Sequence, residues 1–280
     1  MRSLYPAPRF PSVVRPRYSL PGDLAPASLG HRLRFYQRRM DYRSAGEWMS
    51  SPPGDHVYAL ILGRHSGIYP RRFRQLKNVP LVIDDVSEVR GLRPYLVKYL
   101  PEGVYYDRNL YSSLAAARKA RLDYAHAWRS RLFLGQELAF DLDPENVDCP
   151  IHGDVVAKMR RHQGLSFCDW EFEEVRRQAA VLYDELSRTW TDLRIVYSGR
   201  GFHIHVFDER AFRLTRKERG RIAARYPHRY AIDEWVTSGE MRLIRLPYSL
   251  HGMVSRIVLP VPRRDLEKFR YDDPRAFPRL

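Results

Sequence analysis

Two aspartates separated by one residue are the first candidates for chemistry in this sequence. Asp141 directly follows the apolar residues 138–140, and Asp143 comes after Leu142. On a β-strand this spacing points both carboxylates to one face and turns Leu142 toward the core. Neighbouring carboxylates repel each other unless a cation neutralises them, and oxygen ligands suit Mg²⁺ or Mn²⁺. The same pattern also occurs at turns and exposed strand ends, so the pair alone leaves both interpretations open.

A second group of polar residues surrounds a Gly-Arg-Gly turn between two strand-like segments. The glycines let backbone N–H groups approach an anion, and Ser198, Arg200 and His203 add hydrogen-bond donors. This composition favours a phosphate-binding hairpin. The alternatives are an ordinary hairpin with surface histidines, or a zinc site built on His203 and His205, which share one face of the strand.

A third acid, Asp233, opens the segment 232–252, which also carries arginines and a histidine. Arg242 and Arg245 are three residues apart, so a strand would turn them to opposite faces and only one would enter a site. His251 follows in the same segment. A basic edge strand ending in a turn is the alternative interpretation.

The elements that must position these residues alternate between strands and helices, which indicates an α/β or α+β protein with a mixed sheet. Apolar alternation predicts strands at 56–62, 79–83, 104–106, 137–143, 193–198, 202–207, 240–246 and 256–261. Helical spacing predicts helices at 33–48, 92–100, 110–124 and 169–189, the last with Asp169 as its N-cap.

The charge of the chain indicates a polyanionic partner. The net charge is +15, and 48 residues are Lys or Arg, of which six are lysine. Arginine pairs with phosphate through two parallel hydrogen bonds, so nucleic acid is favoured over an anionic membrane, although a merely basic surface is the alternative. The sequence lacks a signal-peptide segment and an apolar run of roughly 20 residues, so we expect a soluble cytoplasmic or nucleoid-associated protein. Residues 1–30, rich in proline and arginine, predict an extended arm.

Together the three segments resemble the catalytic small subunit of archaeal and eukaryotic DNA primases. The resemblance rests on FDLD ending at Asp143, YSGRGFHIHV from Tyr197 and IDEWVTSGEMRLIRLPYSLHG from Ile232, preceded by PEGVYY from Pro101. It covers about residues 90–275. It implies a mixed-sheet primase-polymerase catalytic core with flanking helices, occupying residues 31–280.

The resemblance also implies roles for individual residues. Two divalent cations, Mg²⁺ or Mn²⁺, would be held by three acids: Asp141, Asp143 and Asp233. Glu234 and Glu240 are alternatives for the third acid. The triphosphate of the incoming nucleotide would be bound by five residues: Ser198, Arg200, His203, Arg245 and His251.

Members of this family carry a zinc module between the first two motifs, which implies an inserted zinc-knuckle-like element at about 146–170. The ligands here would be Cys149, His152 and Cys168, with the fourth supplied by His162, Asp169 or Glu171. A disulfide between the two cysteines, or two free thiols, are the alternatives.

The function implied by the resemblance is DNA-dependent primer synthesis on single-stranded DNA from nucleoside triphosphates. A primase large subunit, or fused replication domains, would be the expected protein partner. A repair-type polymerase or terminal transferase of the same superfamily, extending existing 3′ ends, is the first alternative. A non-catalytic nucleic-acid-binding module is the second.

Overall fold

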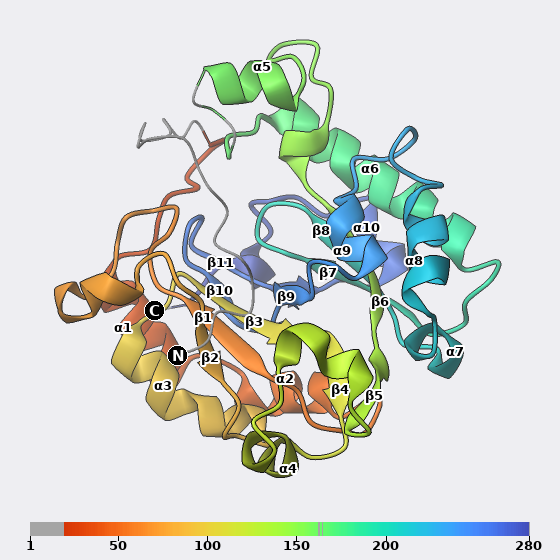
Figure 1. Cartoon of the computed structure of the whole chain (residues 1–280). Helices are drawn as coiled ribbons and strands as arrows, with labels where there is room; N and C mark the ends of the chain where they lie inside the picture. Colours follow the sequence, from red (N-terminus) through yellow and green to blue (C-terminus); the bar gives the residue numbers. More distant parts are fainter. Residues whose placement is uncertain (1–19, 162, 164, 280) are drawn as a thin grey trace.

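Two four-stranded antiparallel sheets form the frame of the protein (Figure 1). The structure is a computed structural model that describes residues 20–161, 163 and 165–279. The first sheet has the order β2 (Leu81–Ile83), β1 (Tyr58–Ile61), β3 (Gly103–Asp107) and β9 (Leu243–Arg245). The second has the order β12 (Leu259–Pro260), β7 (Leu193–Tyr197), β8 (Phe202–Val206) and β6 (Leu138–Leu142).

Two further strand pairs complete the β structure: β4 (Asn109–Tyr111) with β5 (Phe133–Gln136), and β10 (Leu250–His251) with β11 (Arg256–Ile257). Every strand pair among the described residues is antiparallel. The expectation of a mixed sheet is therefore wrong, and the class is α+β.

The helices flank these sheets. They are α1 (Leu29–Arg38), α2 (Tyr42–Met49), α3 (Arg93–Tyr99), α4 (Leu114–Lys119), α5 (Val155–Arg160), α6 (Asp169–Leu186), α7 (Glu209–Phe212), α8 (Arg216–Ala223), α9 (Glu234–Ser238) and α10 (Arg263–Leu266). Short 3-10 turns are η1 (Arg71–Leu76), η2 (Val89–Leu92), η3 (Tyr124–Arg129), η4 (Pro144–Asn146) and η5 (Pro274–Ala276).

Three predicted helices differ in detail from the structure. The helix expected over 33–48 is two helices, because the Asp41 carboxylate accepts the Ser44 N–H and starts α2 as a new helix. The segment 110–124 begins as strand β4, which pairs with β5, and only a short α4 follows. The N-cap of α6 is Cys168 rather than Asp169, in a capping box closed by Glu171.

The second sheet has a different core on each face. Phe172, Val175 and Leu182 of α6 pack with Phe140 of β6 and its neighbours on one face. On the other face, Ala139 joins the cluster formed by the first sheet with α1, α2 and α3. The apolar residues that recur at helical spacing in the sequence of α6 therefore form its buried face.

The N-terminal arm and the predicted insertion are described in part. Residues 1–19 lie outside the described residues, but Leu24 is buried in the core and the Ala27 N–H donates to the Gly252 carbonyl at 2.7 Å. Helix α5, within the predicted insertion, lies at the edge of the molecule beyond the start of α6 (Figure 1). Within the part of the chain that the structure describes, no helix is long and apolar enough to cross a membrane.

Candidate active site

The three predicted aspartates meet at one end of β6. Asp141 lies within β6 and Asp143 directly follows it. Ile232 forms an isolated antiparallel bridge with Leu142, and the Asp233 N–H donates to the Asp141 carbonyl oxygen at 2.8 Å. This backbone contact brings an acid about ninety residues distant in the sequence beside the Asp-Leu-Asp pair.

The electrostatics of this corner favour a bound cation. Burial, together with the charges of Asp141 and Glu145, raises the pKa of Asp143 well above its ordinary value. Burial and the Asp141 charge likewise raise the pKa of Asp233. Burial also opposes ionisation of Asp141, but His203, Arg245 and Arg200 together outweigh it and lower the pKa of Asp141. The His203 Nε2 lies 3.3 Å from the Asp141 Oδ1. One added cation would relieve the repulsion among all these carboxylates.

The Gly-Arg-Gly turn lies between β7 and β8, as predicted. Inside the turn, the Gly201 N–H donates to the Ser198 hydroxyl at 3.1 Å, and the Ser198 carbonyl lies 2.9 Å from the His251 Nδ1. Gly199 has a φ of +101°, and a Cβ there would lie 2.6 Å from the same imidazole nitrogen. Glycine at this position lets the hairpin and β10 approach each other, and so sets the place of His251.

Arg200 is held by a carboxylate that the sequence analysis did not single out. Its guanidinium forms an ion pair with Glu145, two residues after Asp143, and its side chain is buried. Burial opposes the charge of Arg200, but Glu145 and Asp143 raise its pKa. An acid at every second position, Asp141, Asp143 and Glu145, was the signal in the sequence that could have identified this residue.

The two arginines of the third segment separate as their spacing predicts. Arg245 of β9 lies over the Tyr105 ring, 4.9 Å from its centroid, and influences the pKa values of both Asp141 and His251. Arg242 turns the other way and lies 3.7 Å from Asp107. Arg245 is therefore the arginine that enters the site.

His251 is buried among these cations. Burial, followed by the charges of Arg245 and Arg200, lowers its pKa well below the ordinary value. A neutral ring donates through Nδ1 to the Ser198 carbonyl and leaves Nε2 without a proton.

A second histidine, His65, was missed by the sequence analysis and belongs to the same group of charges. Burial lowers the pKa of His65 to about 4. The Glu102 charge acts in the opposite direction, and the charges of Arg64, Arg245 and Arg200 lower the pKa further. The Glu102 carboxylate holds this loop by accepting the backbone N–H groups of His65, at 3.2 Å, and Ser66, at 2.7 Å. Nothing in the local sequence pattern marked this residue.

His205 has a structural environment. It is fully buried, and its Nδ1 lies 2.6 Å from Glu137, whose other oxygen accepts the Tyr106 hydroxyl at 2.7 Å. Its neighbour on the same strand face, His203, instead contacts Asp141. The two histidines therefore have different partners, and the alternative of a zinc site built on this pair finds no support.

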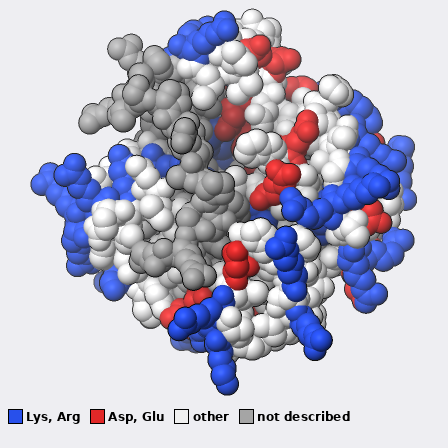
Figure 2. All heavy atoms as spheres, in the orientation of Figure 1, with Lys and Arg blue, Asp and Glu red and all other residues white. Residues whose placement is uncertain are grey.

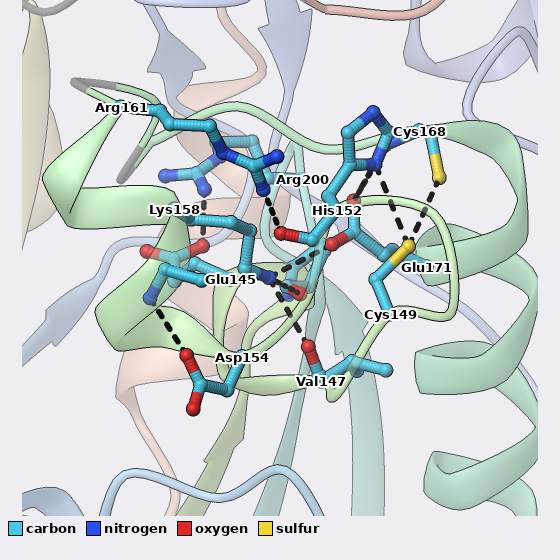
Figure 3. A network of polar contacts seen from close by, with 12 residues as sticks. Glu145, Val147, Cys149, His152, Asp154, Lys158, Arg161, Cys168, Glu171 and Arg200 are labelled. Carbon is cyan, nitrogen blue, oxygen red and sulfur yellow. Dashed lines mark hydrogen bonds and ion pairs between the residues drawn. The ribbon is translucent and has the colours of Figure 1, made fainter.

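Four residues of the insertion form a separate cluster that could hold a metal ion: Cys149, His152, Cys168 and Glu171 (Figure 3). The Cys149 Sγ lies 3.4 Å from the His152 Nδ1 and 3.9 Å from the Cys168 Sγ, and both cysteines are free thiols. Burial raises the pKa of Cys168 to about 11, so metal binding would have to displace its proton.

Glu171 supplies the carboxylate of this cluster, not the exposed Asp169, whereas His162 lies outside the described residues. The Glu171 Oε1 lies 2.8 Å from the buried Lys158 ammonium, and the Glu171 Oε2 accepts the Cys168 N–H at 2.7 Å. A metal ion bound here would share this carboxylate with Lys158.

Comparison with known proteins identifies the family. A DNA primase small subunit-like protein of Archaeoglobus fulgidus is 48% identical over 260 residues, covering 92% of this chain and 91% of that one. The chain belongs to the DNA primase small subunit family. The family model described as DNA primase small subunit matches residues 166–231, and the DNA primase small subunit PriS of Pyrobaculum calidifontis is 27% identical, covering 65% of this chain and 67% of its own.

The fold of this chain also resembles that of a solved polymerase domain. The polymerase domain of Mycobacterium tuberculosis ligase D, solved in complex with DNA, matches with a TM-score of 0.50 and 14% identity, covering 92% of each chain. That likeness establishes a primase-polymerase type of fold and agrees with the α+β class.

Proposed function

We propose that this chain is a DNA-dependent primase/polymerase that transfers nucleotides from nucleoside triphosphates to a 3′-hydroxyl on a single-stranded DNA template. The observation that carries the proposal is the meeting of Asp141, Asp143 and Asp233 beside cationic and imidazole side chains. Membership of the primase small subunit family supports the same activity.

The residues present fit divalent cations. The Asp141 Oδ1 is buried and, apart from the His203 contact at 3.3 Å, has no hydrogen-bond partner among the described residues. Asp143 lies close to two other carboxylates. Two Mg²⁺ or Mn²⁺ ions, held by the three aspartates, would supply Lewis-acid stabilisation of the attacking and leaving oxygens. His203 contacts Asp141 and would orient its carboxylate toward this position.

The triphosphate of the incoming nucleotide would lie along the hairpin. Arg200 and Arg245 provide positive charge, and the backbone around Ser198 provides a tight turn next to His251. A bound triphosphate would offset both arginine charges and raise the pKa of His251, since those charges help to hold it low. A protonated ring would donate from Nε2 to a phosphate oxygen.

We also propose that residues 31–280 form one catalytic domain, with the insertion at 146–170 as a zinc-binding element. Two thiols, an imidazole and a carboxylate are ligand types that zinc accepts. A primase large subunit is the protein partner that membership of this family suggests.

The experiment that tests the activity uses the full chain on an unprimed single-stranded DNA template, with labelled ribo- or deoxynucleotides and Mg²⁺ or Mn²⁺. We expect primers with the wild-type protein and none with the Asp141→Ala/Asp143→Ala double variant, while template binding is retained. Normal incorporation by the double variant would refute the assignment. Extension of a supplied 3′ end without synthesis on the unprimed template would identify a repair-type polymerase instead.

A further inference from the structure

A solvent-exposed tryptophan lies directly beside the third aspartate. Trp235 is 66% exposed, yet its backbone is held firmly: its N–H donates to the Asp233 carboxylate at 2.8 Å, and its carbonyl accepts the Met241 N–H at 2.9 Å. The buried Arg108 donates to the carbonyls of Val236 and Met241 from beneath the same helix, α9. The indole is therefore an exposed aromatic surface on a well-anchored support.

Trp235 and the Gly-Arg-Gly hairpin lie on opposite sides of β6. On one side of β6 lies β8, which carries His203 and continues from the Gly-Arg-Gly turn. On the other side the chain at Ile232 bridges Leu142, and α9 follows at once. A triphosphate on the hairpin side leaves the α9 side as the direction from which an attacking 3′-hydroxyl would approach the aspartates.

Helix α8 packs against α9 and presents a basic surface beside it. Figure 2 shows Lys and Arg side chains gathered over α8, next to acidic side chains around α9. The cations of this surface are exposed: Lys217 and Arg221 lie four residues apart on one side of α8, and Arg225 follows in the turn after the helix. Arg216 reaches toward Glu240, 3.9 Å away, at the junction with the segment that follows α9.

We propose that Trp235 and the α8 cations bind the nucleic-acid strand whose 3′ end is extended. The indole stacks on a base near that end, and the cations of α8 contact the phosphates that lead away from it. Every base has an aromatic face and every nucleotide a phosphate, so this surface would hold the strand without regard to sequence. The inference rests on the proposed function, because it assumes that a strand end is brought to the aspartates.

The test measures binding of the full chain to a fluorescently labelled DNA primer-template, without nucleotides, by anisotropy. We expect Trp235→Ala to weaken binding by about 5- to 150-fold, the range that loss of one base-aromatic stack produces. Trp235→Phe should retain most of the affinity. Trp128→Ala is the matched control, because Trp128 is also exposed, at 47%, but lies on η3, and its loss should leave binding unchanged.

Salt dependence separates the two parts of the surface. Lys217→Ala/Arg221→Ala should lower the slope of log affinity against log salt concentration by about 1 to 2, since each phosphate contact contributes roughly 0.9. Trp235→Ala should leave that slope unchanged, because stacking releases no counterions. In the wild-type protein, DNA should quench tryptophan fluorescence, and Trp235→Phe should remove most of that quenching. This second readout does not require the Trp235→Ala variant to fold.

Wild-type affinity in Trp235→Ala, or quenching that persists in Trp235→Phe, would overturn the inference. The proposed function would survive that result, provided the wild-type protein still incorporates nucleotides. If the wild-type protein instead binds the primer-template through Trp235 but never incorporates a nucleotide, the proposed function fails and the binding surface stands.

Discussion

Replacing Lys158 with methionine tests how the insertion is attached to the end of β6. The Lys158 side chain is 1% exposed and that of Glu171 is 0% exposed, and their charged atoms lie 2.8 Å apart. The ammonium also donates to the Val147 carbonyl at 3.1 Å and the Pro144 carbonyl at 3.3 Å (Figure 3). One side chain therefore links α5, the start of α6 and the turn that follows the aspartate pair.

The expected cost of Lys158→Met follows from this geometry. Methionine has a similar length but no charge, so the buried Glu171 carboxylate loses its cation and two carbonyls lose a donor. Breaking a buried ion pair from one side costs about 3–5 kcal/mol. For a chain of this size we expect the melting temperature to fall by roughly 6–20 °C, at about 2–4 °C per kcal/mol.

A double variant isolates the cause. Lys158→Met/Glu171→Gln removes both charges but keeps an acceptor for the Cys168 N–H, so it should recover much of the lost stability. Arg43→Met is the control, because the Arg43–Glu47 pair is exposed and its loss should not measurably change the melting temperature. The assay is thermal unfolding followed by circular dichroism. A single variant as stable as wild type, or a double variant no more stable than the single, would refute the reasoning.

Two further changes test the site and the core. Gly199→Ala should lower kcat/KM for the nucleotide by about 10- to 100-fold, because the new Cβ would lie 2.6 Å from the His251 Nδ1 and displace that ring. Gly46→Ala is the control and should leave kcat/KM unchanged, because a Cβ at Gly46 meets no atom within 4 Å. Equal kcat/KM for the wild-type protein and both variants would contradict this account. Burial lowers the pKa of His56, which lies beside the Asp107 carbonyl, so the unfolded chain takes up its proton first and stability falls as the pH drops below about 6.5. His56→Asn should remove this group's share of the stability that is lost between pH 7 and pH 5, measured by denaturant unfolding, and an unchanged pH dependence would contradict the prediction.

The elements with a strong local signal were predicted from the sequence. Strands β6, β7 and β8 lie where apolar alternation indicates them, and α6 begins at Asp169 as its helical period requires. The segment 110–124 was predicted wrongly, because its first residues pair with β5 and a strand partner outweighs helical propensity. The interruption at Asp41 was missed because an N-cap inside an apolar pattern is easily taken for a polar position of one helix.

The sequence identifies which acids, arginines and histidines are available for chemistry, and which of them share the face of a strand. It could do so because strand and turn geometry act over a few residues, as in the spacing of Asp141 and Asp143 or the glycines beside Arg200. Which distant groups meet depends on the packing of the whole fold. The bridge at Ile232 brings Asp233 to Asp141, Glu145 pairs with Arg200, and Glu171, held by Lys158, completes the cysteine cluster. Such contacts depend on sheet order and helix packing, which no local pattern encodes.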